Sequence, residues 1–286
     1  MYLPNENPDI RFIEKGHIYI DKNNRILRSM SQAKKLLKPA ADFKKLAYFT
    51  AKKRKPMASE DELNKETDVV LAEWEVKRDT AANKGTVIHN VIHKYTTTGL
   101  LEKDQLPYLP FCNRLLQYFQ FYHKSFNEYL LDFDGTAGTA DKICQRQKKE
   151  DSVYDFFDYK TNETKEGESY IKYDSMKVKE GEIKHYNRFL NEPLSYLEDC
   201  NYNDYCVQLS GYAYMAEKKY GIKVGKLAII NILNGFGNDI PTTFEIIPVP
   251  YMRYEMEVFW NYLGNLKSLP GQSKILKTEF ITDNEW

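Results

Sequence analysis

The residues best suited to chemistry are a carboxylate and an amine two positions apart, Asp158 and Lys160. They close an aromatic-rich run, residues 153 to 159, whose aromatic and β-branched content predicts a buried strand. Because alternate side chains of a strand share a face, the two are predicted to point the same way. Such a pair can hold a divalent metal through the acid and stabilise charge on a phosphate through the amine. The alternative is an ordinary ion pair at a strand end, before a turn at Asn162. Residues 158 to 161 alone favour this alternative, because short motifs often match by chance.

A second carboxylate, Asp141, lies in a predicted neighbouring strand over residues 136 to 144, after a first strand over residues 128 to 133. Gly138 in the middle strand lets a backbone or a ligand come close. Asp141 and Asp158 are therefore expected on adjacent strands. Two carboxylates so placed favour a magnesium site, since Mg²⁺ prefers oxygen ligands and leaves its other positions to water and phosphate.

Two histidines, His89 and His93, lie one helical turn apart in a predicted helix over residues 87 to 95. Gly85 is expected to end the preceding charged helix, residues 60 to 83. The spacing is similar to that of the zinc helix H-E-x-x-H, but the catalytic Glu of that motif is missing. A helical His is more often a hydrogen-bonded packing residue than a ligand, and His93 is expected to be one.

The remaining patterns predict an α/β protein with a largely helical N-terminal region. Further strands are expected at residues 10–12, 17–20, 25–27, 224–233 and 243–249. Further helices are expected from Ser29 or Ser31 to residue 37, and at residues 42–53, 109–126, 205–220 and 250–266. Residues 162 to 202 carry many charges and few patterns, so they are expected to form an insertion or lid.

Charge is divided by region, although the 286-residue chain has no net charge. Residues 1 to 60 hold 14 Lys and Arg against 6 Asp and Glu, a net of +8, which leaves −8 for the rest. The chain length suits one large core with an appended region. We therefore expect a basic arm at residues 1–64 and a core at residues 65–286, the arm meeting an anionic partner. A solvated basic helix is the commoner meaning of such a bias.

The cysteine spacing and the apolar pattern argue against a zinc knuckle, a secreted protein and a membrane-spanning protein. The cysteines show no CxxC pair or zinc-knuckle spacing and are expected to be reduced: Cys112, Cys144, Cys200 and Cys206. The first residues lack the basic and apolar regions of a signal peptide, and no apolar run approaches the ~20 residues of a membrane span. We expect a cytoplasmic protein.

Four motifs in this order resemble those of the PD-(D/E)XK nuclease superfamily, in particular its RecB-like and phage-type exonuclease branch. They are Gly85-Thr86-Val87-Ile88-His89, Gly138-Thr139-Ala140-Asp141, Asp158-Tyr159-Lys160-Thr161 and Gln208-Leu209-Ser210-Gly211-Tyr212. The resemblance covers roughly residues 65 to 235. It implies a restriction-endonuclease-like core, a mixed central sheet flanked by helices. Ala140 stands where the motif's name has proline, a common departure in this branch.

The resemblance also implies roles for single residues. His89, Asp141, Asp158 and the backbone carbonyl of Tyr159 become metal ligands, and Lys160 orients the attacking water or stabilises the phosphate. The other implied site residues are Glu128, as a supporting acid or second-metal ligand, and the DNA contacts Gln208, Tyr212 and Thr161. The basic cluster of the arm adds candidate phosphate contacts: Lys52, Lys53, Arg54 and Lys55.

These expectations combine into a Mg²⁺- or Mn²⁺-dependent deoxyribonuclease, an exonuclease acting on linear or single-stranded DNA ends in replication, recombination or repair. No iron-sulfur cluster is expected, because the cysteines do not match that of some relatives. Partners would be DNA and recombination or replication proteins, in the host cytoplasm if the chain is phage-encoded. Two alternatives stay open. One is a non-catalytic single-stranded DNA-binding protein that uses the basic arm and its abundant tyrosines as stacking platforms. The other is a zinc hydrolase using His89 and His93.

Overall fold

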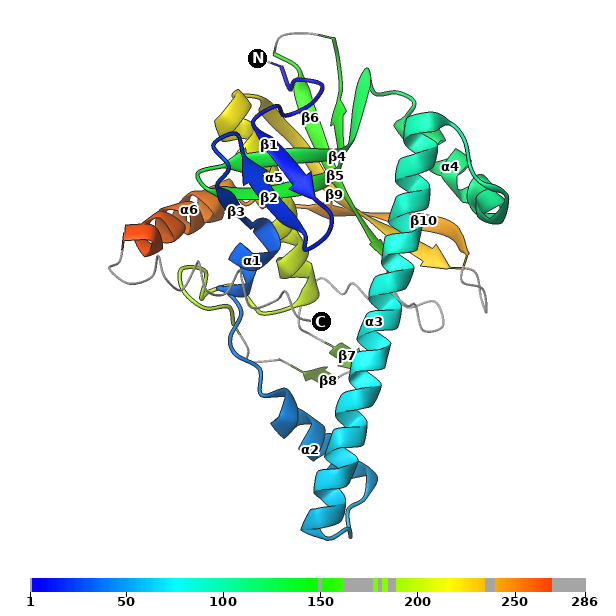
Figure 1. Ribbon diagram of the computed structural model, residues 1–286, viewed down its shortest axis with the longest axis vertical. Helices are drawn as coiled ribbons and strands as arrows, with labels where there is room; N and C mark the ends of the chain where they lie inside the picture. The colour runs from blue at the N-terminus through cyan, green and yellow to red at the C-terminus, as the bar shows by residue number, and fades with distance from the viewer. Residues whose placement is uncertain are drawn as a thin grey trace.

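The computed structural model describes residues 2–148, 151–161, 177–179, 182–184, 189–234 and 240–268, which form an α/β fold on one mixed sheet (Figure 1). Eight strands of the described chain build this sheet: β1 (Ile10–Ile13), β2 (Ile18–Asp21), β3 (Ile26–Ser29), β4 (Lys124–Phe133), β5 (Thr136–Gln145), β6 (Val153–Thr161), β9 (Lys223–Asn234) and β10 (Pro241–Val249). The helices are α1 (Met30–Lys35), α2 (Phe43–Arg54), α3 (Glu60–Thr98), the 3-10 helix η1 (Lys103–Tyr108), α4 (Leu109–Phe119), α5 (Asn201–Tyr220) and α6 (Arg253–Ser268). The expected α/β class is confirmed.

Strand β5 pairs differently along its two edges. On one edge β4 runs antiparallel to it from Thr136 to Gln145. On the other edge β3 pairs in parallel with Thr136 and Ala137, whereas β6 pairs antiparallel with residues 142–145. Within the described chain no strand pairs with residues 138–141 on that edge, so the sheet divides there; we call this gap the fork. The sheet continues beyond β6 with β9, which is parallel to β6, and then with β10, which is antiparallel to β9.

Each face of the sheet has its own apolar core. Helices α5 and α6 contribute to the core on one face, the α5-side core, and α3 and α4 to the core on the other, the α3-side core. Strand β6 alternates between them: Tyr154 and Phe156 belong to the α5-side core, Phe157 and Tyr159 to the α3-side core. All four are buried. Full burial of a large apolar side chain stabilises the fold by about 1.5–3 kcal/mol, so β6 is anchored from both faces.

Helix α3 is continuous for 39 residues, from a capping box of Ser59 and Glu62 to Gly99 at φ +70°. The predicted helix end at Gly85 is therefore wrong. Glycine inside a helix costs about 1 kcal/mol relative to alanine. Here a Cβ on Gly85 would lie 3.1 Å from Oγ1 of Thr161, so the glycine lets α3 pass close to the end of β6.

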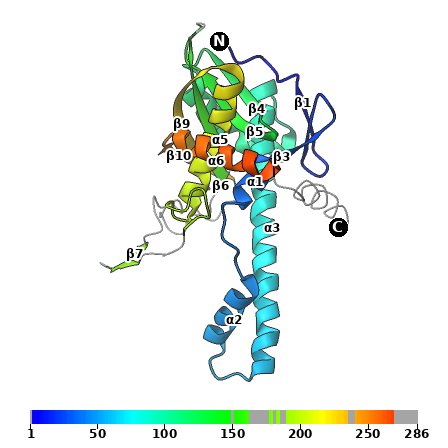
Figure 2. The same cartoon turned by 90° about the vertical axis from the view of Figure 1, so that its left-hand side faces the viewer.

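The first half of α3 projects away from the sheet and carries α2 (Figures 1 and 2). At 1.5 Å per residue α3 is about 58 Å long. Buried Ala47 and Ala51 line the side of α2 that packs on α3. We call α2 together with residues 60–80 of α3 the helical arm.

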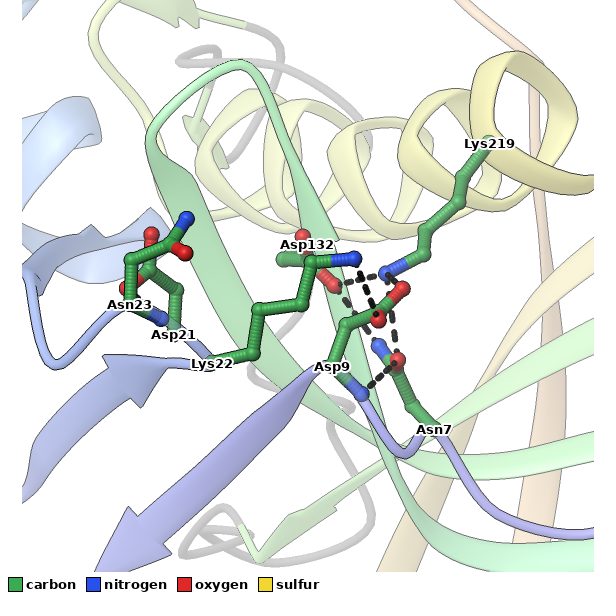
Figure 3. Close-up of polar contacts among 7 residues, drawn as sticks. All are labelled: Asn7, Asp9, Asp21, Lys22, Asn23, Asp132 and Lys219. Atoms are coloured by element: carbon green, nitrogen blue, oxygen red, sulfur yellow. Dashed lines mark hydrogen bonds and ion pairs between the residues drawn. The ribbon is translucent and has the colours of Figure 1, made fainter.

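A polar cluster ties the start of the chain to the sheet and to α5 (Figure 3). Nζ of Lys219 donates to Oδ1 of Asn7 at 3.1 Å and to Oδ1 of Asp132 at 2.5 Å, and it pairs with Asp9 at 3.0 Å. The hydrogen bond from Lys219, and then that from Lys22, holds the pKa of Asp9 below its usual value. The first strands thus belong to the sheet, and the domain boundary expected after residue 64 falls inside α3.

Two expected elements have different bounds in the structure. The predicted helix over residues 109–126 ends at Phe119, and β4 begins at Lys124, before the predicted strand start. Phe126 explains the difference, because it pairs with Ile143 across β4 and β5 and both are buried. Of the expected insertion, residues 162–176, 180–181 and 185–188 lie outside the described residues. In the described part β7 (Lys177–Lys179) pairs antiparallel with β8 (Glu182–Lys184).

No described helix combines the length and the apolar character that crossing a membrane requires.

Candidate metal centre

Three side chains able to hold a metal ion meet at the fork: His89 of α3, Glu128 of β4 and Asp141 of β5. One ligand atom from each lies within 4.8 Å of the other two. Ligands of a single divalent cation lie at most about 5 Å apart, so the three can share one ion. Nδ1 of His89 and Oδ2 of Asp141 are 3.7 Å apart.

A backbone distortion turns Glu128 toward α3. Phe126 and Tyr129, three positions apart on β4, both belong to the α5-side core, although regular alternation places such residues on opposite faces. Between them Glu128 has φ +48°, in the left-handed region that non-glycine residues rarely adopt. This conformation costs on the order of 1–3 kcal/mol, and residues in it cluster at functional sites.

Strand β5 has the matching distortion at Asp141. Ala140 and Ile143 both belong to the α5-side core, so Asp141 and Lys142 between them both turn to the α3 side. Nζ of Lys142 accordingly lies 4.5 Å from the ring centre of Phe119 in α4. The register between β4 and β5 is the same before and after this level. The two strands therefore distort together and present both carboxylates to His89.

Both backbone polar groups of Tyr159 have partners at the fork. Its N–H donates to Oδ2 of Asp141 at 2.7 Å, just beyond the last paired residues of β5 and β6. Its carbonyl oxygen, predicted as a metal ligand, interacts with Nε2 of His89 at 3.1 Å. With Nε2 as the donor, Nδ1 keeps its lone pair and faces Asp141. The β6 backbone thus orients two of the three candidate ligands.

Asp158 and Lys160 form an ion pair on the α5 side of β6, and their predicted shared face is confirmed. Asp158 is 3% exposed, and the Lys160 ammonium lies 5.1 Å from the ring centre of Tyr205 in α5. Asp158, predicted as a ligand, lies outside the group of three. An ion pair is also what the purely structural interpretation of this motif predicts.

Negative charge gathers in this site with little water to stabilise it. Burial, and then the charges of Asp141 and Asp158, raise the pKa of Glu128 to about 8. Burial and Asp158 raise the pKa of Asp141 to about 6, against the opposing effects of His89 and Lys160. Burial disfavours the ammonium of Lys160, but Asp158 and Asp141 outweigh it and raise that pKa to about 12. Three carboxylates near one ammonium leave a charge that a divalent cation can neutralise.

Gln208 and Tyr212, predicted to position nucleic acid, form a hydrogen-bonded chain with a buried lysine. Nε2 of Gln208 donates to the Tyr212 hydroxyl at 3.1 Å, and its Oε1 accepts from Nζ of Lys34 at 3.0 Å. Lys34 also pairs with Asp204 at 2.6 Å. The Tyr212 ring packs so closely on Gly138 that a Cβ there would lie 2.5 Å from Cε1. These contacts join α1, α5 and strand β5 beside the fork.

The sequence patterns did not single out two polar residues that lie near the site. Lys34 belongs to the lysine-rich N-terminal region, where composition does not indicate which lysine is buried. Asn231 pairs with Lys160 in the register of β6 and β9; it is fully buried, and neither its Oδ1 nor its Nδ2 has a partner in the described chain. Its signal is a single polar residue in the otherwise apolar run of residues 227–233.

His93 is not part of the group that His89 joins. Its Nδ1 is buried without a hydrogen-bond partner among the described residues, and burial lowers its pKa. The expected hydrogen bond is therefore not found at this atom. Thr161, predicted to contact DNA, ends β6 half-buried beside Gly85.

The predicted phosphate-binding cluster at residues 52–55 divides in two. Arg54 pairs with Glu73 at 2.7 Å and with Glu66 at 3.4 Å, and Lys55 pairs with Glu66 at 2.6 Å. The two lysines before them are exposed and form no ion pair with any residue that the structure describes. Half of the cluster is thus engaged within the helical arm.

Comparison of the chain with models of known protein families finds no match, and comparison with curated proteins finds no relative.

Proposed function

We propose that this chain is a metal-dependent nuclease with a restriction-endonuclease-like core, of the PD-(D/E)XK type, and that it acts on DNA as an exonuclease. The main support for this proposal is the fork. There, one ligand atom each of His89, Glu128 and Asp141 lie within 4.8 Å of one another, beside the ion pair of Asp158 and Lys160. A purely structural ion pair explains the last two residues only. It gives no reason for a left-handed glutamate, an aspartate and a histidine to meet next to it.

The donor set fits Mg²⁺ or Mn²⁺. Carboxylate oxygens suit both ions, and one imidazole is compatible with Mn²⁺ in particular. When bound, such an ion polarises the scissile phosphate and lowers the pKa of a bound water. A zinc hydrolase built on two histidines is less well supported, since His93 lies outside the group.

The protein residues have separate tasks in this proposal. His89, Glu128 and Asp141 hold the cation, and the backbone of Tyr159 orients His89 and Asp141. Lys160, kept charged by Asp158, stabilises negative charge on the phosphate. The chain of Lys34, Gln208 and Tyr212 keeps α5 in place above the site.

The test is hydrolysis of linear and circular DNA labelled at the 5′ or the 3′ end, with Mg²⁺ or Mn²⁺ and with a chelator. We expect metal-dependent release of label from linear DNA that Asp141→Asn abolishes. Mn²⁺ binding followed by electron paramagnetic resonance gives a readout independent of turnover. Cleavage that survives chelation would overturn the proposal, and metal binding without cleavage would favour a DNA-binding protein.

A further inference from the structure

The outward face of α2 carries aromatic and apolar side chains where a solvated helix carries polar ones. Phe49 is 50% exposed, and Phe43 and Leu46, at the preceding three-residue steps, are 63% and 47% exposed. The opposite side of α2 is buried through Ala47 and Ala51. At 3.6 residues per turn, Phe49 lies about opposite the midpoint of Ala47 and Ala51 on α2, so its ring faces away from α3.

Three lysines surround Phe49. Lys45, Lys52 and Lys53 lie four positions before it and three and four positions after it, the spacings that make neighbours on a helix surface. All three are exposed, and none forms an ion pair with any residue in the described ranges. Arg54, by contrast, lies on the side toward α3 and pairs with two glutamates.

The ring of Phe49 is also supported from below. Tyr48 contacts it edge to face, with ring centres 6.2 Å apart. The hydroxyl of Tyr48 donates to Oε2 of Glu60 at 3.0 Å, so it is tied to the start of α3. An exposed ring held in this way loses little conformational freedom when a flat partner stacks on it.

We propose that the outward face of α2 is a second binding surface of this protein, specific for single-stranded DNA. Bases stack on Phe49, and phosphates contact Lys45, Lys52 and Lys53. Stacking on aromatic rings beside a basic surface is how proteins bind single strands without sequence preference. The identification of the polymer as DNA rests on the proposed nuclease function, whereas the need for an anion with flat groups rests on the surface itself.

The surface lies at a useful distance from the fork. Glu66 and Glu73, which hold Arg54, precede His89 by 23 and 16 residues on the same helix, about 35 and 24 Å along its axis. A strand held on α2 can therefore reach the fork only if several nucleotides span the projecting half of α3. The surface is expected to retain the strand during repeated cleavage.

The test measures binding of an oligothymidylate of about 20 nucleotides to the full chain in chelator, where no cleavage takes place. Phe49→Ala is compared with Phe121→Ala, which removes an 85% exposed phenylalanine elsewhere. We expect Phe49→Ala alone to weaken binding, by roughly 5- to 150-fold, the effect of one lost base stack. The same loss in both variants, or in neither, would overturn the proposal.

Charge is tested by replacing Lys45, Lys52 and Lys53 together with glutamine. The matched control replaces the exposed lysines Lys15, Lys65 and Lys103. The first variant is expected to flatten the salt dependence, log K against log salt, by about 2 units, and the control is not. Equal flattening in both, or tighter binding to phosphatidylserine vesicles than to the oligonucleotide, would overturn the proposal.

The two proposals fail separately. If metal-dependent cleavage is absent but oligothymidylate binding depends on Phe49, the nuclease proposal fails and the surface stands. If cleavage is present but neither set of substitutions changes binding, the surface fails and the nuclease stands.

Discussion

The two ends of helix α3 use charge in opposite ways. Near its C-terminal end, His89 meets Glu128 and Asp141 in a site that shifts the pKa of both acids upward. Near its N-terminal end, Glu66 and Glu73 pair with basic residues in the helical arm, and their pKa values are lowered, chiefly by those hydrogen bonds. Two unit charges 4 Å apart interact by about 1 kcal/mol in water and about 4 kcal/mol at an effective dielectric constant of 20. Burial, more than residue type, therefore decides which cluster can do chemistry.

The largest expected effect is at the buried end. Asp141→Asn is predicted to lower cleavage by at least about a thousandfold, the equivalent of about 4 kcal/mol of transition-state stabilisation. The variant is also predicted to be more stable than the parent at pH 8 without metal, because it removes a buried charge. Labelled-DNA assays and thermal unfolding in chelator measure the two effects. Loss of activity together with loss of stability would mean that Asp141 serves the fold.

The ion pair next to this group should affect stability as well as activity. Lys160→Met leaves Asp158 buried without its partner, which costs about 3–5 kcal/mol when a buried pair is broken. The double variant Asp158→Asn with Lys160→Met is predicted to recover much of that loss but no activity. Denaturant unfolding of the three proteins measures this. If Lys160→Met unfolds like the parent, the pair is not coupled to folding.

The two histidines of α3 separate the metal site from simple packing. His89→Ala is predicted to weaken Mn²⁺ binding at least about tenfold, whereas His93→Ala leaves it unchanged because His93 is outside the group. Each variant serves as the control for the other in a metal titration. Equal losses in both, with activity restored by zinc, would support the zinc hydrolase instead.

The pH dependence of stability distinguishes a buried acid from an exposed one. The pKa of Glu128 is raised from the ordinary 4.5 to about 8, so its contribution to stability is full below pH 4.5 and is lost as pH rises through 8. Without metal, Glu128→Gln is thus predicted to gain Tm over the parent from pH 5 to pH 8. Comparing variant with parent cancels the histidines, which titrate in both. A constant difference across this range would contradict the raised pKa.

The sequence identifies local patterns better than the geometry that joins them. The shared face of Asp158 and Lys160 follows from strand alternation alone, and the order of the strands supports the α/β class. The fork was not predictable, because it needs β3 and β6 to share one edge of β5, a contact between residues far apart in the chain. Glu128 reaches His89 only through a left-handed backbone that no propensity favours.

The surroundings of Gly85 and of the basic residues 52–55 are not evident from the sequence. Gly85 suggests a helix end from sequence, but it is in fact the point where α3 passes β6, which only the packed structure reveals. Residues 52–55 appear uniform in sequence, yet their direction on α2 separates the paired members from the exposed ones. Both features depend on packing against a neighbouring element, which local sequence does not contain.

The smallest effect is expected at the exposed end of α3. Arg54→Gln removes two ion pairs of the helical arm. The pair with Glu73 is exposed, where such pairs contribute little, and Glu66, which is 11% exposed, keeps its pair with Lys55. We therefore predict no measurable change in Tm and no change in the salt dependence of oligothymidylate binding, because Arg54 is turned toward the glutamates of α3. The matched change is Lys53→Gln, which keeps Tm but is predicted to flatten the salt slope by about 0.7, the value for one phosphate contact on a single strand. Equal slopes for the two variants would mean that paired and exposed basic residues serve the arm alike. The two sides of α2 would then not differ in their contribution to binding.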